Sequence, residues 1–420
     1  MSSTTRATST PCTARHTAHT DARERAGFAS PPGQQEVGAH SKGATPLRRG
    51  SLRRAAAVAA CCALLLSPDT SRAASFMDMF KDPTDGQFDT SEWLLNKRGV
   101  LPVPIIITEP AIGYGGGAAL LFFHSSEKDE EKRASNEPLG LPPGVSAVFG
   151  GGTENGTWFA GGGHFGTWKE DHIRFTGGGG YGSVNLDFYA GDQPLAFNME
   201  GGALYARGEF RIPDTRLFVG AAYQFSKVDA LRQSGPPLLP DEVGRTIGGL
   251  GLITHWDSRD SIFTPSKGQD LYLGAMFNAP AFGGDSTWQQ LGYKLHSFHP
   301  IRERLVASLR FDGNAVWGDV PFYAQPFVQL RGIPAMRYQG EAAGEGEIDL
   351  RVRVWRRWSL VGFFGLGWTA GGTSDDNGPF PAGGGGIRYL LARRLGMQVG
   401  IDVARGPEDT AFYIVVGSAW

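Results

Sequence analysis

Cysteine is almost absent from this chain of 420 residues, which holds three, Cys12, Cys61 and Cys62. We therefore expect no disulfide, thiolate metal site or cysteine nucleophile in the rest of the protein. Long apolar runs are also missing, because no stretch after Leu66 approaches the roughly 20 uncharged residues that a membrane-spanning helix needs. These two absences exclude a disulfide-stapled domain and a helical membrane protein.

Motifs for common catalytic and cofactor sites are missing as well. The histidines are scattered without HExxH spacing, and no GxSxG motif, Walker loop or dinucleotide fingerprint occurs. Glycine runs at 177–180 and 383–386 fall within predicted strands, where they favour sharp curvature. We expect no enzyme, metal site or cofactor, and a hydrolase triad assembled inside a barrel is the alternative.

The formal net charge of −2 conceals a basic N-terminal part and an acidic remainder. Arginines cluster at positions 48–54, ahead of an apolar stretch at 55–66 and a small-residue site that ends at Ala73. This pattern is typical of an export signal, so we predict that residues 1–73 are a signal with a long N-terminal extension, cleaved near Ala73. A short membrane anchor and lipidation at Cys61 are the alternatives.

Apolar and polar residues alternate with period two over much of residues 101–420. In "EIDLRVRVW" (347–355), four charged residues, Glu347, Asp349, Arg351 and Arg353, alternate with aliphatic ones. Since successive side chains of a strand point to opposite faces, such a strand has one apolar and one ionic face. The same alternation recurs at residues 290–296, 305–317 and 396–404. These segments alone also fit a soluble β-sandwich.

The number of strands and their connections favour a membrane barrel. We expect about 16 strands of about ten residues, an even number of the length that crosses a bilayer. The first is predicted at 112–123, two more at 171–181 and 183–191, and the last at 410–420. Short turns at 153–156, 213–216 and 356–358 alternate with long loops at 124–144, 228–243, 318–345 and 371–380. We predict an all-β, antiparallel transmembrane barrel over 101–420, preceded by a short periplasmic lead-in or plug at 74–100.

The last predicted strand ends the chain on an aromatic residue. It places Phe412, Ile414, Val416 and Trp420 on one face. We predict that these four residues form the C-terminal signal by which outer-membrane barrels are recognised for insertion.

Three stretches resemble the BamA/TamA-like outer-membrane protein family, also called the bacterial surface antigen family. They are "LPVPIIITEPAIGYGGGAALLFF" (101–123), "THWDSRDSIFTPSKGQDL" (254–271) and "PFVQLRGIPAMRYQGEAAGEGEIDLR" (326–351). The resemblance implies a 16-stranded barrel whose sixth extracellular loop folds into the lumen. Larger members carry POTRA domains before the barrel, and because 74–100 is too short for one, we expect a POTRA-less member.

The resemblance also implies a lock between the sixth loop and the barrel wall. Arg331 and Gly332 match the core of the family's Val-Arg-Gly-Phe/Tyr motif, whose arginine pairs with wall carboxylates. Gly365 of "FFGLG" stands where the family has an aspartate. We therefore predict that Arg331 pairs with Glu347 or Asp349 on the neighbouring strand. The alternative is that these carboxylates pair with arginines of their own strand.

Six further residues are predicted to shape the loops and turns rather than to carry chemistry. They are Arg337 in the sixth loop and Asp257, Arg259, Asp260, Pro265 and Gly268 in a periplasmic turn.

The implied function is non-enzymatic assistance of polypeptide or lipid insertion or translocation at the bacterial outer membrane. The resemblance places it at a strained seam between the first and last strands. The alternative is a passive channel or a surface-structural protein, since 16 strands leave room for an aqueous lumen. Expected partners are outer-membrane lipid, lipopolysaccharide and client polypeptides, with no nucleic acid and a monomeric state. Acidic segments at 125–137 and 374–377 are expected to be solvated outer loops.

Overall fold

The computed structural model describes residues 80–91, 93, 100–124, 144–235, 242–372, 377–418 and 420. All of them belong to the second of two compact units, Pro68–Trp420. The predicted export signal, residues 74–79, 92 and 94–99 of the predicted lead-in, the acidic segment 125–137 and residues 374–376 lie outside the described residues.

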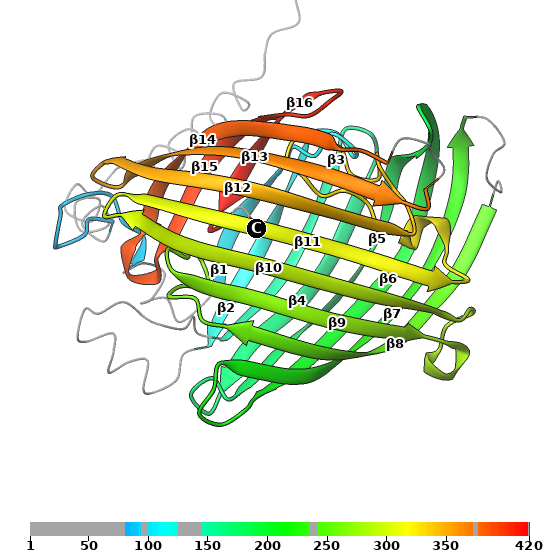
Figure 1. Ribbon diagram of the computed structural model, residues 1–420, viewed down its shortest axis with the longest axis horizontal. Coiled ribbons are helices and arrows are strands. Elements are labelled where there is room, and N and C mark those ends of the chain that lie inside the picture. The colour runs from blue at the N-terminus through cyan, green and yellow to red at the C-terminus, as the bar shows by residue number, and fades with distance from the viewer. Residues whose placement is uncertain are drawn as a thin grey trace, which may run out of the picture. The chain divides into compact units, whose positions relative to one another are not determined.

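Sixteen strands form one antiparallel sheet in which each strand pairs with its neighbours in chain order (Figure 1). This arrangement confirms the predicted all-β, 16-stranded fold. The strands are β1 (Val100–Ile107), β2 (Gly115–His124), β3 (Gly144–Thr153), β4 (Trp158–Trp168), β5 (Ile173–Ala190), β6 (Gln193–Arg211), β7 (Leu217–Ser234), β8 (Glu242–Asp257), β9 (Gly268–Asn278), β10 (Trp288–Arg302), β11 (Leu305–Gly318), β12 (Ala342–Trp355), β13 (Trp358–Ala370), β14 (Phe380–Ala392), β15 (Met397–Arg405) and β16 (Thr410–Val416). Three short 3₁₀ segments, η1 (Pro280–Phe282), η2 (Phe322–Ala324) and η3 (Arg393–Leu395), lie in the connections.

Two errors in the predicted strands cancel in the total. β1 was not predicted as a strand, and its Pro102 and Pro104 explain why, since proline cannot donate to a ladder and is tolerated only at a sheet edge. β5 is one strand of 18 residues rather than two. Its glycines at 177–180 conceal the alternation, because glycine has no side chain that marks a face.

The two ends of the barrel differ from the predicted pattern of connections. We call the end where β1 begins and β16 ends the terminal end, and the opposite end, which holds the connection 319–341, the loop end. Because the strands alternate in direction, β2 ends and β3 begins at the terminal end, whereas the short turn 154–157 lies at the loop end. The predicted assignment of short turns to one end and long loops to the other is therefore wrong for these two connections.

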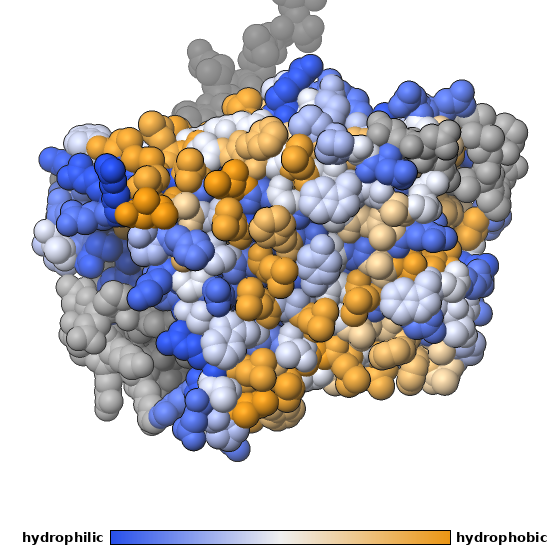
Figure 2. All heavy atoms as spheres, in the orientation of Figure 1, coloured by the Kyte–Doolittle hydropathy of each residue, from blue (hydrophilic) through white to orange (hydrophobic). Residues whose placement is uncertain are grey.

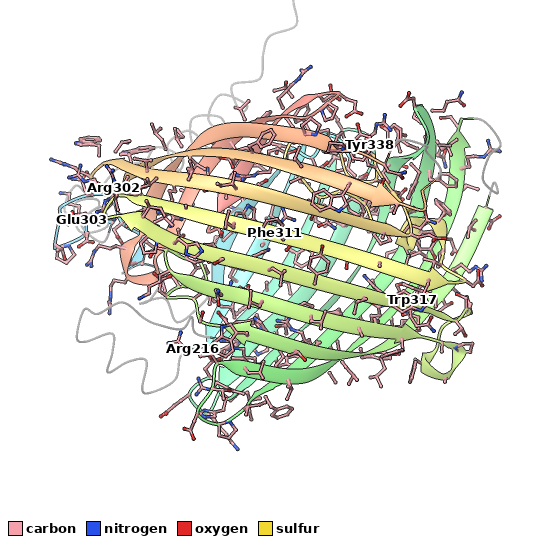
Figure 3. The ribbon with its side chains drawn as sticks, viewed as in Figure 1. Arg216, Arg302, Glu303, Phe311, Trp317 and Tyr338 are labelled. Atoms are coloured by element: carbon pink, nitrogen blue, oxygen red, sulfur yellow. The ribbon has the colours of Figure 1, made fainter. Side chains whose placement is uncertain are left out.

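The outer surface of the barrel is apolar and much of the inner surface is ionic. On β12, Ile348 and Leu350 are 42% and 43% exposed, whereas Glu347 and Asp349 are buried inside. Figure 2 shows apolar residues gathered over the outward face of the strands in view. In Figure 3, Phe311 lies in the middle of β11, while Arg302 and Trp317 lie near opposite ends of β10 and β11. Among the described residues, no helix is long and apolar enough to span a bilayer.

Aromatic side chains form the largest buried apolar cluster, at the loop end of the lumen. Phe322 of η2 packs its ring against Phe188 of β5 and Phe197 of β6, with centroids 4.8 and 4.9 Å apart. Ile247 and Trp288 complete the contact with the wall. The first part of the connection 319–341 is thus anchored inside the barrel by apolar burial.

Candidate functional site

The connection 319–341, which we call loop 6, continues along the inner wall towards β14. Val328, Leu330 and Ile333 are each no more than 3% exposed and pack against Phe380. The ring of Tyr338 stacks on Phe380 with centroids 3.6 Å apart. Apolar side chains therefore hold loop 6 against the wall and bring its arginine to a defined place.

Arg331 lies at the centre of a buried ionic cluster. Its Nη2 donates to Glu347 Oε1 at 2.5 Å and to Asp349 Oδ2 at 3.4 Å, and its Nη1 donates to Asp402 Oδ2 at 2.6 Å. Its guanidinium carbon lies 3.4 Å above the ring centroid of Phe363. A planar cation with several donors suits this arrangement of carboxylates around an aromatic face.

Asp402 is the partner of Arg331 that the sequence reasoning did not assign. It is fully buried on β15, and both its carboxylate oxygens accept hydrogen bonds from Arg388 of β14, at 2.5 and 2.8 Å. Alternation in 396–404 had placed Asp402 on the polar face, which was the available signal. We call the set Arg331, Glu347, Asp349, Phe363, Arg388 and Asp402 the lock.

Gly365 has no carboxylate because loop 6 occupies the place where one would lie. A Cβ at this position would lie 2.8 Å from Leu330 Cδ2, and a Cβ at Gly367 would lie 2.3 Å from Val328 Cγ1. The two glycines let the apolar side of loop 6 approach the wall of β13. Arg331 therefore pairs with carboxylates of β12 and β15, the strands on either side of β13 and β14.

Introducing aspartate at Gly365 is expected to destabilise the barrel by about 2 kcal/mol or more, since it overpacks the contact with Leu330 and buries a further anion. The midpoint of urea unfolding reports the change. Leu330→Ala in the same chain should recover part of the loss by making room. Because Gly362 faces lipid, the control on the same strand is a pair of alanines: Gly365→Ala should be destabilising, whereas Gly362→Ala, whose Cβ meets nothing within 4 Å, should not. If G365D alone leaves the midpoint unchanged, Leu330 does not fill this place.

The tip of loop 6 touches both edge strands. Gly332, at φ +98°, donates its N–H to Tyr413 Oη of β16 at 2.9 Å. Ala335 donates its N–H to Glu109 Oε1, just after β1, at 3.2 Å. A Cβ on Gly332 would lie 2.8 Å from Gly406 N, so glycine is required both by the left-handed backbone and by the close approach.

The edge strands β1 and β16 form a seam. Among the described residues, no hydrogen-bonded ladder joins them, and each pairs only with its other neighbour, β2 or β15. Pro102 and Pro104 remove two backbone donors from β1. Outside the barrel, Tyr114 and Phe412 stack across the seam with ring centroids 5.7 Å apart. Side chains and loop 6, rather than a ladder, hold this part of the wall.

The C-terminus does not follow the predicted face. Phe412, Ile414 and Val416 are 40–59% exposed on the outer side of β16, but β16 ends at Val416. Trp420 lies in the lumen, where its Nε1 donates to Glu347 Oε1 at 2.5 Å and its ring stacks on Phe298. Figure 1 marks the C-terminus within the outline of the barrel. The prediction that Trp420 shares the apolar face is wrong, because Gly417, at φ +83°, redirects the chain.

The predicted structural turn 258–267 reaches across the terminal end of the lumen. Asp257 pairs with Arg259 at 3.0 Å and also with Arg174 of β5 at 2.8 Å. Pro265 O accepts a hydrogen bond from Arg351 of β12 at 2.8 Å. Within the turn, Asp260 accepts hydrogen bonds from Ser266 and Lys267, and Gly268, at φ +106°, lies against Ser258 O. Arg351 is thus used by this turn, and in the part of the chain that the structure describes Glu347 and Asp349 form their ion pairs with Arg331.

Arg337 ties loop 6 to two connections at the loop end. Its guanidinium donates to Glu408 at 3.0 Å and to Asp192 at 2.9 Å, and lies 4.6 Å above the ring of Tyr189. Glu408 belongs to the connection that precedes β16. This half-exposed cluster adds a second, weaker attachment beside the lock.

Residues 80–91, which we call the N-terminal strap, bind the turns at the terminal end. Arg357, between β12 and β13, pairs with Asp82, Asp85 and Asp89 at 2.5, 2.7 and 2.5 Å. Asp82 also pairs with Arg393 of η3. Because the strap precedes β1 yet binds β12–β15, it connects the two sides of the seam. The acidic residues in "DPTDGQFD" were part of the predicted lead-in, but their partners were not foreseen.

Strong acid is expected to release the N-terminal strap. Burial alone would raise the pKa of Asp82, but hydrogen bonds from Arg393 and Thr84 outweigh it and lower the pKa from 3.8 to about 2. A lowered pKa stabilises the bound state above pH 3.8, and this contribution is lost as the pH falls through about 2. A nitroxide on Pro83→Cys should be immobile at pH 5 and mobile near pH 2.

The same label tests whether Asp82 holds the strap in place. Asp82→Asn should mobilise the nitroxide already at pH 5, whereas a nitroxide on Arg302→Cys, at the end of β10, should be insensitive to both changes. An immobile label in the D82N protein at pH 5 would show that other contacts hold the strap.

Solved structures with a similar fold are BamA from Haemophilus ducreyi lacking POTRA domains 1–3 and CdiB from Escherichia coli. The first has a TM-score of 0.53 and 10% identity, covering 76% of this chain and 70% of that one. The second has a TM-score of 0.52 and 12% identity, covering 75% of this chain and 62% of that one. This chain therefore spans less than two thirds of the length of CdiB. No protein-family model and no curated protein sequence matches this chain. At these identities the likeness is one of fold.

Proposed function

We propose that this protein is an outer-membrane barrel that assists the insertion or translocation of polypeptide or lipid through its seam. The unpaired seam between β1 and β16 carries the proposal. In hydrocarbon, unpaired backbone groups are costly, so an incoming strand that pairs with a free edge gains hydrogen bonds that the resting barrel lacks. The fold shared with BamA and CdiB supports this function, which the sequence resemblance also implies.

The outer surface supports a position in a membrane. Large apolar side chains are exposed on nearly every strand, including Leu252 at 64%, Leu273 at 51% and Phe364 at 52%. Apolar surface of this extent on a folded protein marks contact with lipid or with another protein. The proposed location is the outer membrane, with lipid and lipopolysaccharide as neighbours, and the 16-stranded antiparallel sheet with its apolar exterior supports it.

The strand beside the seam, β16, is also short. β16 has 7 residues, whereas β6 has 19. At roughly 3.4 Å per residue and a tilt of about 40°, the shorter strand crosses only about 18 Å, less than the apolar band of about 25 Å. Lipid beside β16 must thin to match it, which lowers the barrier to insertion there.

The test is a folding assay in liposomes. Purified protein in the bilayer should accelerate folding of a urea-denatured eight-stranded barrel by about tenfold or more over empty liposomes. A barrel of the same size with a fully paired wall is the control for the effect of any embedded protein. If folding is not accelerated and planar bilayers instead show a large, steady conductance, the protein is a passive channel.

A further inference from the structure

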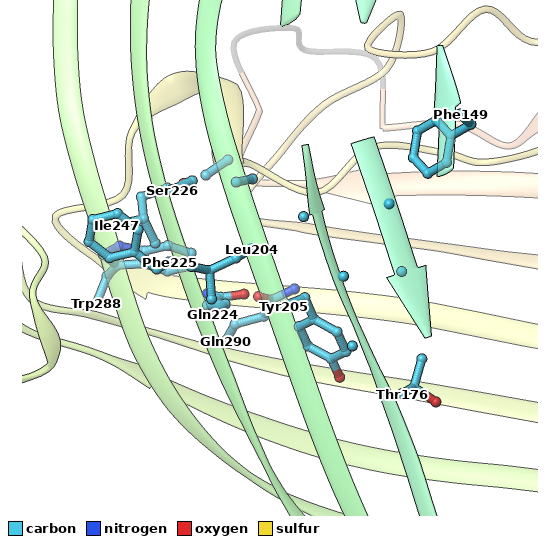
Figure 4. A pocket seen from close by; sticks show the side chains of 17 residues that line it. Phe149, Thr176, Leu204, Tyr205, Gln224, Phe225, Ser226, Ile247, Trp288 and Gln290 are labelled. Carbon is cyan, nitrogen blue, oxygen red and sulfur yellow. The ribbon is translucent and has the colours of Figure 1, made fainter. Parts of the chain in front are cut away.

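The barrel contains an apolar cavity away from the seam and the lock. It has a volume of about 640 Å³ and lies against the inner faces of β4–β8 and β10 (Figure 4). Tyr205 and Trp288 are among the residues that line it, with Gln224, Ser226 and Gln290 as the main polar ones. No charged residue lines the cavity, whereas the opposite wall carries the ionic lock.

Both ends of the cavity are defined by neighbouring residues on the same strands. Towards the loop end, the cavity borders the cluster of Phe188, Phe197 and Phe322, which shares Ile247 and Trp288 with its lining. Towards the terminal end, the inward side chains become ionic, beginning with Arg207, two residues beyond Tyr205 on β6. Arg207 pairs with Glu209 at 3.2 Å, but its buried Nε has no hydrogen-bond partner among the described residues. The cavity is therefore an apolar slot next to a buried ion pair, in which Arg207 Nε is an unused donor.

Glycine forms one side of the slot. On β4 these residues are Gly162 and Gly163, and beside them the ring of Phe149 lies over Gly161, where a Cβ would be 2.9 Å from the ring. The run Gly177–Gly179 continues the same side-chain-free surface on β5. An occupant therefore meets smooth backbone there rather than projecting side chains.

Two polar side chains of the lining already donate to residues outside it. Gln224 Nε2 donates to Asn278 Oδ1 at 2.8 Å, and Gln290 Nε2 donates to Asn314 Oδ1 at 3.4 Å. A polypeptide would bring one N–H and one C=O for every residue, all in need of partners that this lining lacks. A hydrocarbon chain brings none, and the volume is within the range of about 300–1,000 Å³ typical of small-ligand pockets.

We propose that this cavity binds the acyl chain of an anionic amphiphile, with its head group directed towards Arg207. The inference goes beyond the proposed function, because it involves neither the seam nor the lock. A free fatty acid and one chain of an anionic phospholipid share this chemistry.

Photolabelling tests the proposal. Full-length protein in nanodiscs is irradiated with palmitate that carries a diazirine in mid-chain, and labelled residues are mapped by mass spectrometry. We expect labels on the inward residues Tyr205, Ser226 and Trp288, lost on competition with excess palmitate. Phosphatidylglycerol with the same diazirine in one chain forms the second arm, and the arm that labels the inward residues identifies the source of the chain.

Matched substitutions separate the cavity from the annular lipid. Ser226→Leu or Ala203→Leu fills the slot and should lower inward labelling at least about tenfold, while Ala221→Leu, exposed on the outer face of β7, should not change it. Retention of heat-modifiable gel mobility shows that each variant is folded. Labels confined to outward residues such as Val219 and Leu250, or inward labelling unaffected by both cavity-filling variants, would overturn the proposal, as would inward labelling by an apolar diazirine peptide but by neither lipid.

Discussion

Replacing Arg331 with alanine is expected to destabilise the barrel by about 3–5 kcal/mol and to free the tip of loop 6. The side chain is 9% exposed and contacts Glu347, Asp349 and Asp402, so its removal leaves buried carboxylates without their main cation. Arg388 still neutralises Asp402, but Glu347 keeps only the N–H of Trp420. Urea unfolding and trypsin cleavage after Arg337 report stability and loop release.

Two further variants test whether the loss of stability is due to the charge of Arg331. Arg331→Ala combined with Glu347→Gln should recover part of the loss, because it removes an uncompensated buried anion. Arg302→Ala, an exposed arginine at the terminal end, is the control and should stay within about 0.5 kcal/mol of the parent. The lock would be refuted if R331A retained the trypsin resistance and heat-modifiable mobility of the parent.

Stability alone does not show that loop 6 matters for the seam. The tip contacts Tyr413 on one edge strand and Glu109 beside the other, so releasing it should also loosen the two edges. In R331A, a fluorophore placed at Phe412→Cys should therefore gain mobility, whereas one at Ile348→Cys on β12 should not. This difference separates a local effect at the seam from general loosening of the barrel.

Alternation was a sound guide to the face that each strand turns inwards. It placed Glu347, Asp349 and Asp402 on polar faces, because a barrel wall enforces period two on every residue between lipid and lumen. It failed at β1 and at the glycine run of β5, where proline and glycine conceal the period. The strand total was right although two of its members were not.

The lock shows what a sequence alone could not supply. Position 365 holds glycine where the family has an aspartate. The predicted partners of Arg331 were therefore Glu347 and Asp349 on β12, which are close to it in the sequence. Asp402 lies 71 positions away, and it meets Arg331 only because β12 to β15 curve around loop 6. The position of Trp420 depends on a single glycine, Gly417, whose left-handed backbone no pattern of apolar residues reveals.

The N-terminal strap, the lock and the C-terminal residue Trp420 all contact the part of the wall that lies near the seam. The N-terminal strap precedes β1 and binds the turns of β12–β15, loop 6 contacts β16 and Glu109 just after β1, and Trp420 reaches the same carboxylate as Arg331. Side-chain contacts thus replace the missing backbone ladder. Under the proposed function, the seam would open by releasing these contacts, without unfolding the rest of the sheet.

Cross-linking the seam is expected to abolish most of the insertion activity. Tyr114 and Phe412 face each other on the outer side with ring centroids 5.7 Å apart, so cysteines at both positions lie within reach of a short bis-maleimide. The parent for this experiment carries serine at Cys12, Cys61 and Cys62. If clients enter through the seam, the cross-linked protein should lose at least about tenfold in the rate of client folding, since the free edge of β1 is no longer presented.

The control pair is Leu120→Cys with Val148→Cys, which are register partners in the ladder between β2 and β3 and lie outside the seam. Cross-linking this pair adds the same reagent to a wall that is already closed, so activity should be retained. A linker with a cleavable disulfide should restore activity at the seam upon reduction, which excludes damage by the reagent. Full activity of the cross-linked seam would show that insertion does not pass between β1 and β16 and would leave the lumen or the lipid around the barrel as the route.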